Sequence, residues 1–246
     1  MALSMSRLFQ LISPVVLAAL FSSCAGPSVP SSAGRDVLGH RPGPKGFRTV
    51  IIDAGHGGKD SGATSPHTRQ MEKDLTLDLA KRLRAELSGD FKTILMRDDD
   101  TFIDLDERVI RANQFGGILV SLHFNSGPSG IRGPETYYWR VDSHGLAVRC
   151  QQAMASVSPG ESGNRGLVRR RIRLTRNPEI PCLLLEGGYL SNPAESRLCA
   201  DPAYRQKLAR AIAGAIRAQA ANGDAGTGPL PPPLTAPPSR PTDAPE

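Results

Sequence analysis

Residues 49–58 read TVIIDAGHGG, a continuous apolar run that leads directly into a glycine-rich loop. An apolar run of this length is typical of a strand buried on both faces, as in a parallel sheet. The glycines let the backbone turn sharply after the strand and bring His56 close to whatever the loop binds. We therefore interpret the segment as a buried strand that delivers a histidine to the edge of a sheet.

The following segments alternate between helical and strand patterns. From Glu72 to Leu87 apolar residues recur every four positions, which predicts an amphipathic helix with Glu72 in its first turn. Apolar runs at 93–96 and 117–123 predict two strands, and the segment 104–115 predicts a helix between them. The order predicts one α/β domain with a mostly parallel sheet flanked by helices. Ligands of such sheets collect at the carboxyl ends of the strands, where His56 and His123 fall.

The second half of the chain shows the same two patterns. Asp201 and Pro202 are typical of the cap and the first residue of a helix, so they predict the start of a closing helix. The other expected elements are strands at 135–139, 168–174 and 183–186 and a helix at 145–157.

The two ends of the chain differ in composition from the middle. A chain of 246 residues with 39% hydrophobic residues has room for one catalytic domain and appendages. The end of the chain is rich in proline, glycine and alanine, and such a segment does not bury enough apolar surface to order itself. We expect a signal peptide at 1–24, a linker at 25–46, the catalytic domain at 47–221 and a disordered Pro-rich tail at 222–246.

The N-terminus has the pattern of an export signal. The apolar run from Leu11 to Phe21 follows a single positive charge and is too short for an ordinary membrane span. The segment Phe21-Ser22-Ser23-Cys24 resembles a bacterial lipoprotein processing site, which favours acylation of Cys24 and an exported, periplasmic, membrane-anchored protein. The alternative is a plain secretory signal, cut after small residues around Cys24, which would discard that cysteine and leave the protein without an anchor.

The three other cysteines are Cys150, Cys182 and Cys199, an odd number in a compartment that allows disulfides. At most one pair can form within the chain. Cys182 begins an apolar run, which favours a buried free thiol there. None of the three has the spacing of a cysteine zinc site.

Four polar residues stand out: His56, Glu72, His123 and Glu186. Each of the first three has an ordinary structural explanation when taken alone, such as a first-turn acid favoured by the helix dipole. Glu186 follows three leucines, and a buried carboxylate is costly unless a metal, a proton or a partner compensates it. Two imidazoles and a carboxylate can hold zinc with one position open for water, and a further carboxylate can act on that water. Together they predict a hydrolase site.

From Thr49 to Arg217 the chain resembles the zinc-dependent N-acetylmuramoyl-L-alanine amidases that cut bacterial peptidoglycan. The resemblance implies a central twisted sheet flanked by helices, one Zn²⁺ held by His56, Glu72 and His123, and Glu186 as the catalytic acid/base. The motifs that carry it keep their order along the chain and lie at 53–63, 72–74, 97–98, 105, 108–113, 121–123, 133–138 and 185–193.

The same resemblance implies the function and the surroundings of the site. The expected reaction is hydrolysis of the amide between N-acetylmuramic acid and L-alanine, for wall remodelling, cell separation or turnover. Glu135, in the Gly-x-Glu-Thr segment, is expected to line the substrate pocket. Some family members carry a long helical insertion that blocks the zinc, whereas only Phe124 to Arg132 separates His123 from Gly133 here, so we expect no obligatory activator.

Two rival interpretations stay open at this point. A catalytically silent lipoprotein could use the same groove to bind peptidoglycan, and a zinc peptidase could cut within the stem peptide. The formal charge of +6 and a run of arginines also raise the question of nucleic acid. An exported chain seldom meets nucleic acid, so we interpret the run as a solvated strand face that favours an anionic wall polymer. These arginines are Arg165, Arg169, Arg170, Arg171, Arg173 and Arg176.

Overall fold

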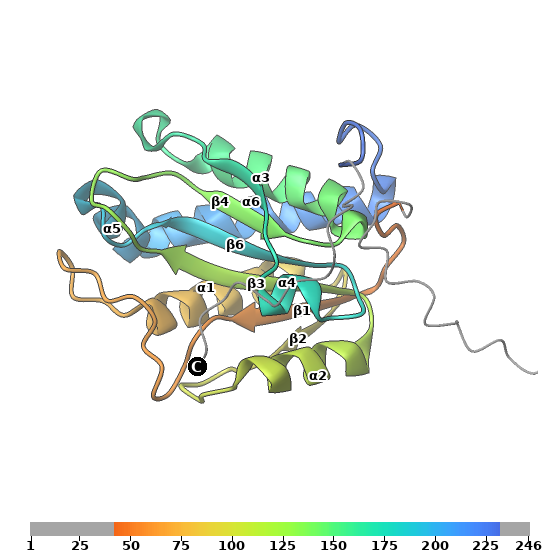
Figure 1. Ribbon diagram of the computed structural model, residues 1–246, viewed down its shortest axis with the longest axis horizontal. Coiled ribbons are helices and arrows are strands. Elements are labelled where there is room, and N and C mark those ends of the chain that lie inside the picture. The colour runs from red at the N-terminus through yellow and green to blue at the C-terminus, as the bar shows by residue number, and fades with distance from the viewer. Residues whose placement is uncertain (1–41, 232–246) are drawn as a thin grey trace, which may run out of the picture. The chain divides into compact units, whose positions relative to one another are not determined.

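A computed structural model describes residues 42–231 (Figure 1). The expected signal peptide with Cys24, most of the expected linker and most of the expected tail lie outside the described residues. No helix within 42–231 combines the length and the apolar character that a membrane span needs. The strands are β1 (Thr49–Ala54), β2 (Lys92–Leu95), β3 (Ile118–Asn125), β4 (Glu135–Tyr138), β5 (Gly166–Arg169) and β6 (Cys182–Tyr189). The α-helices are α1 (Glu72–Leu87), α2 (Leu105–Phe115), α3 (His144–Val157), α4 (Arg173–Arg176), α5 (Pro193–Ala200) and α6 (Pro202–Asn222), with short 3₁₀ turns at Val141–Ser143 and Gly160–Ser162.

The six strands form one sheet in the order β2-β1-β3-β6-β4-β5. Neighbouring strands are parallel except for β4 and β6, which are antiparallel, so β4 and β5 run against the other four. The α/β class and the mostly parallel sheet predicted from the sequence are confirmed. A consequence is that β4 and β5 begin at the edge where β1, β3 and β6 end.

The helices cover the two faces of the sheet unequally. The three long helices α1, α3 and α6 lie together on one face, and the shorter α2 and α4 lie on the other (Figure 1). The four-residue recurrence in α1 buries Leu75, Leu79, Leu83 and Leu87 in the larger core, while the core on the α2 side is much smaller. The face under α2 and α4 is therefore the one with room for a site.

Alternation along the strands places the polar residues on that same face. In β3, Val120, Leu122 and Phe124 belong to the larger core, so Ser121 and His123 point to the opposite face. The register pairs His123 with Glu186 of β6, and Glu186 with Glu135 of β4. Residues far apart in the sequence thus meet side by side at one edge of the sheet.

One predicted strand has the wrong bounds. The segment 168–174 was expected to be extended, but β5 ends at Arg169 and the chain turns into the short helix α4. Arg170 N still donates to the Tyr138 carbonyl of β4 at 2.9 Å, and the chain then turns, with Thr175 Oγ1 donating to the Arg170 carbonyl at 2.9 Å. The helix α5 was not predicted, although its cap Asn192 and the proline that follows are a regular start signal.

The prediction that the arginines form one solvated strand face is also wrong. Arg171 is 6% exposed and its guanidinium lies 5.4 Å from the centre of the Trp139 ring, on which Arg169 also packs at 5.6 Å. Arg173 approaches Asp106 of α2 at 3.6 Å. Several of these arginines therefore hold the sheet edge to neighbouring elements and do not form one solvated stripe.

The folded part reaches beyond the predicted domain at both ends. Gly43 N donates to Asp224 Oδ2 at 2.6 Å, and Gly46 N donates to the Ala220 carbonyl at 2.8 Å. The residues just before 47 and just after 221 therefore pack against each other at the end of α6. The remaining domain boundaries stay predictions.

The three cysteines within the described residues are free and buried. Cys182 is a buried thiol, as predicted. Burial raises the pKa of the Cys150 thiol to about 12 and also raises that of Cys182, so both are inert at neutral pH.

Candidate metal centre and its surroundings

The structure brings His56, Glu72 and His123 together. Glu72 Oε1 lies 3.0 Å from His56 Nε2 and 2.9 Å from His123 Nδ1. The two imidazole rings meet nearly edge to face, with centres 4.9 Å apart and planes at 77°. One ligand atom from each residue lies within 4.8 Å of the other two, so the three side chains form a group that can hold a metal ion.

Two glycines make this convergence sterically possible. A Cβ on Gly55 would collide with the His123 ring, so only glycine lets the end of β1 pass that imidazole. Gly62 has φ +61°, and a Cβ there would lie 2.7 Å from Glu72 Oε2. His56, between them, also adopts a left-handed φ of 62°. The glycine-rich loop is therefore needed for close approach of the ligands as well as for the turn.

Hydrogen bonds from outside the group orient its members. Asp60 Oδ2 lies 2.7 Å from His56 Nδ1, which leaves Nε2 facing Glu72. Glu72 Oε2 accepts from Ala63 N at 2.9 Å, and Glu72 Oε1 accepts from Phe124 N at 3.1 Å. Partners of this kind fix the orientation of metal ligands and increase their basicity.

The electrostatics of the group favour a cation at its centre. Burial lowers the pKa of His56, but Glu72 and then Asp60 outweigh it and raise that pKa to about 9. Burial raises the pKa of Glu72, but hydrogen bonds and charge from His123 and His56 outweigh it, so that carboxylate stays ionised. A divalent cation must displace a proton from His56, and its affinity should therefore increase as the pH rises toward 9. Two imidazole nitrogens and one carboxylate oxygen are a donor set that fits zinc with a position left open.

Glu186 lies beside this group without a partner of its own. It is 9% exposed, and its Oε2 has no hydrogen-bond partner among residues 42–231. Burial raises its pKa well above the usual range, and the negative charges of Glu72 and Glu135 raise it further. Buried polar atoms are nearly always satisfied, so an unsatisfied carboxylate with a raised pKa points to a functional role.

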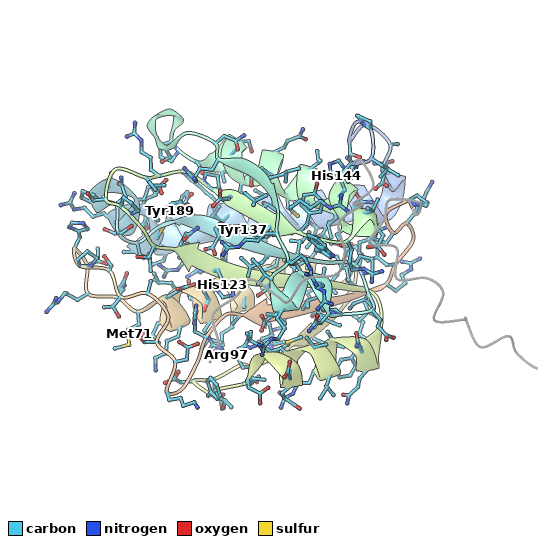
Figure 2. All side chains as sticks on the ribbon, viewed as in Figure 1. Met71, Arg97, His123, Tyr137, His144 and Tyr189 are labelled. Carbon is cyan, nitrogen blue, oxygen red and sulfur yellow. The ribbon has the colours of Figure 1, made fainter. Side chains whose placement is uncertain are left out.

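Glu135 is the neighbour of Glu186 across the strands, and its carboxylate is fully engaged. Its Oε2 accepts from the hydroxyls of Tyr137 at 2.7 Å and Tyr189 at 3.1 Å, and Arg165 Nε lies 3.4 Å from its Oε1. Figure 2 labels Tyr137, Tyr189 and His123, which come from β4, β6 and β3. Sequence patterns alone did not select the two tyrosines or Arg165 for the site. Tyr137 lies on the same strand as Glu135, and the pairing of β4 with β6 and with β5 brings Tyr189 and Arg165 to it.

A hollow of about 520 Å³ opens directly onto the metal-binding group. It touches His56 and His123, and Phe102 and Leu174 form part of its apolar wall. Lys59 stands at its rim, with Nζ 4.3 Å from the centre of the Phe102 ring. We call this the apolar hollow. A substrate can reach the candidate ligands through it.

A buried ion pair holds the loop that carries His56. Arg108 of α2 pairs with Asp53 at the end of β1, and Ser121 Oγ donates to Asp53 Oδ2 at 2.6 Å. Arg108 Nη2 also donates to the His56 carbonyl at 2.7 Å. Although burial raises the pKa of Asp53, Arg108 and then Ser121 hold it below the usual value, so the pair is charged.

We expect Asp53→Asn to destabilise the protein by about 3–5 kcal/mol, because it leaves the Arg108 charge buried without its partner. The matched control is Glu107→Gln, which breaks the exposed pair with Arg111 and should cost at most about 1 kcal/mol. Denaturant unfolding of both variants measures the two effects. Equal stability of both variants would contradict the structural role of the buried pair.

The remaining histidines lie elsewhere. His67 is exposed, as predicted, with Nε2 3.3 Å from the Ser191 carbonyl, and His144 begins α3. His40 lies outside the described residues. Among residues 42–231, His56, Glu72 and His123 are the single group of histidine, cysteine and acidic side chains placed to hold a metal ion.

A mostly parallel α/β sheet with two imidazoles and a carboxylate at its carboxyl edge, beside an unpaired buried glutamate, is typical of metal-dependent hydrolases. The sequence profile of the N-acetylmuramoyl-L-alanine amidases matches residues 50–218. The chain belongs to that family.

Individual relatives agree with the profile. The probable cell wall amidase LytH of Staphylococcus aureus is 33% identical over 172 residues, which cover 69% of this chain and 57% of LytH. The chain thus matches little more than half the length of that curated relative. An N-acetylmuramoyl-L-alanine amidase from Clostridium difficile 630 has a similar structure, with a TM-score of 0.66, 34% identity, and coverage of 71% of this chain and 97% of that one. The CwlD amidase of Clostridioides difficile, solved in complex with the GerS lipoprotein, has a TM-score of 0.63 and 32% sequence identity. The match covers 69% of this chain and 96% of that one.

Proposed function

We propose that this protein is a zinc-dependent amidase that hydrolyses the bond between N-acetylmuramic acid and L-alanine in peptidoglycan. The observation that carries the proposal is the unpaired carboxylate of Glu186 beside the group of His56, Glu72 and His123. Family membership supplies the substrate class, and the apolar hollow supplies access to the site.

The reaction adds water to the lactyl carbonyl carbon and breaks the bond from that carbon to the alanine nitrogen. A zinc ion held by His56, Glu72 and His123 would polarise the carbonyl and lower the pKa of water toward ~7. Glu186 accepts the proton of the attacking water on its free oxygen and returns it to the departing nitrogen of L-alanine. The raised pKa of Glu186 suits both steps, because it makes the carboxylate a stronger base than an exposed glutamate.

Mass spectrometry of digested peptidoglycan tests the proposal against its rivals. An amidase releases glycan strands without peptide, and intact stem peptides that begin with a free L-alanine amine. A peptidase would produce cleaved stems that are still attached to glycan. A binding protein would pull down with sacculi and release nothing, and either of these last two results would overturn the proposal.

We expect the purified mature protein to be active without a partner protein. The connection from β3 to β4 spans only Ser126 to Pro134, and the apolar hollow leaves His56 and His123 accessible. Dye release from labelled sacculi, measured with the protein alone and after addition of membrane extract, shows whether the activity depends on a partner. A requirement for the extract would count against an open site, even though the CwlD structure shows that a related amidase binds a lipoprotein.

The sequence and the relatives support a proposal for the cellular location. Similarity to a cell wall amidase supports export to the wall, and Cys24 is the proposed site of the lipid anchor. We expect metabolic labelling with a fatty acid to mark the protein, and Cys24→Ala to remove the label while the released protein keeps its hydrolytic activity. Labelling that persists in Cys24→Ala would exclude this anchor.

A further inference from the structure

A second hollow, of about 590 Å³, lies at the same edge of the sheet, near β4 and β5. Its walls come from the connection between β3 and β4 and from the residues that precede β5. Both segments reach this edge because β4 and β5 run against β6. Its polar lining includes Arg132, Ser162, Asn164 and Arg165, and we call it the arginine hollow.

The arginine hollow is linked to Glu186 through one residue. Arg165 Nε lies 3.4 Å from Glu135 Oε1, and Glu135 is the register partner of Glu186 on the neighbouring strand. The Arg165 guanidinium also lies 5.5 Å from the centre of the Tyr189 ring, which limits its freedom. Neighbouring strands lie about 4.8 Å apart and an extended peptide advances about 3.5 Å per residue. The guanidinium is thus roughly one to two peptide residues away from the proposed acid/base.

The two hollows differ in charge. The residues that line the apolar hollow include the acids Asp53 and Asp60 as well as the cations Lys59 and Arg108. Among the lining residues whose side chains the structure describes, the arginine hollow has two arginines and no aspartate or glutamate. Arg132 is exposed, and within residues 42–231 its guanidinium makes no hydrogen bond or ion pair. Guanidinium groups bind carboxylates through two parallel hydrogen bonds, so this hollow suits an acidic group.

The walls of the arginine hollow are held in place by a buried carboxylate. Glu195 of α5 accepts from Gly133 N and from Tyr189 N, each at 2.8 Å. Gly133 has φ +103°, and a Cβ there would lie 2.7 Å from the Ser162 carbonyl, so the two walls are in close contact. A hollow that is fixed before binding loses less entropy when the ligand enters.

We propose that the arginine hollow binds a carboxylate of the stem peptide, on the residue that follows L-alanine. This inference rests on the proposed amidase function and deepens it. The peptide then extends from Glu186 toward β5, and the glycan occupies the side of the apolar hollow. Arg132 and Arg165 are specificity residues that distinguish an acidic second residue from its amide.

The test uses two muramyl dipeptides that differ only in the second residue, which carries a free carboxylate in one and a carboxamide in the other. The wild-type protein should hydrolyse the acid with a kcat/KM at least about tenfold higher, as expected for a charge-assisted hydrogen bond. Arg132→Gln, the variant that leaves Glu135 untouched, should lose most of this preference by slowing the acid alone. Arg165→Gln should do the same. The control Arg84→Gln, an exposed arginine on α1, should change neither rate.

Equal rates on the two dipeptides, or variants that slow both equally, would overturn the proposal that the arginine hollow binds a carboxylate. The proposed amidase function would still stand. If the wild-type protein cleaves neither dipeptide, calorimetry with the free peptide of L-alanine and the acidic second residue decides the matter. Binding that Arg132→Gln weakens about tenfold supports the hollow. Equal binding by wild type and variant, or no binding to either, overturns it. Failure of the amidase function itself would appear separately, as intact peptidoglycan in the digest.

Discussion

Glu186→Gln is expected to lower turnover by about 10²–10⁴-fold while the metal content stays unchanged. Glutamine has nearly the same shape but does not accept and return the proton that the reaction needs. Glu186 is not one of the three converging ligands, so zinc should remain bound at the wild-type stoichiometry. Single-turnover hydrolysis of labelled sacculi and zinc analysis of the same samples measure both quantities.

The structure also predicts how this variant folds. Within the part of the chain that the structure describes, Glu186 Oε2 makes no hydrogen bond that glutamine would break, so the melting temperature should stay close to that of the wild type. Glu107→Gln is the matched control, because it makes the same chemical change at an exposed site on α2 and should be fully active. Near wild-type turnover in Glu186→Gln would show that another group transfers the proton.

His123→Ala is expected to remove both the metal and the activity. One of three protein ligands is lost, and the affinity for zinc should fall by more than the ~10–100-fold that is usual for an outer partner. His123 is a cleaner choice than Glu72, because both oxygens of Glu72 also accept backbone hydrogen bonds from Ala63 and Phe124. The measurement is zinc per chain after dialysis against a chelator, followed by an assay with and without added zinc.

Graded variants give this prediction its controls. Asp60→Asn weakens the orientation of His56 without removing a ligand, so its zinc affinity should fall by about 10–100-fold and excess zinc should restore activity. His67→Ala changes an exposed histidine in the loop before α1 and should behave as the wild type. If His123→Ala retained stoichiometric zinc, or if the chelated wild type remained fully active, the metal centre would have to be placed elsewhere.

Strong local patterns were sufficient to predict most of the elements. The four-residue recurrence predicted the observed bounds of α1, and the apolar runs predicted the ends of β1 and β3 to within two residues. The strand β6 is longer than the predicted 183–186, because it continues through Gly187 and Gly188 to Tyr189. In the structure a Cβ on Gly187 would lie 2.9 Å from Phe124, so this glycine is required by close packing of β6.

The helix α5 was missed although its start signal is local, whereas the bounds and order of the strands depend on distant partners. The strand β5 pairs with β4 from Gly166 to Arg169, and the residues around Arg169 do not encode that partner. The position of β6 between β3 and β4 is likewise a result of long-range packing. It places Glu135 beside Glu186, so the sequence could name Glu135 as a pocket residue but could not give it Tyr137, Tyr189 and Arg165 as partners.

The sequence by itself determined the inventory of the site: two histidines at the ends of buried strands, an acid in the first turn of a helix and a glutamate after three leucines. These signals are local, because apolar periodicity and glycine placement reflect the conformation and burial of the residues that carry them. Only the tertiary structure decided that His56, Glu72 and His123 converge, that Glu186 Oε2 has no hydrogen-bond partner among the described residues, and that two arginines line a hollow next to Glu135. The physical reason is that strand order and register depend on burial of the whole sheet between its helices, which no short segment specifies.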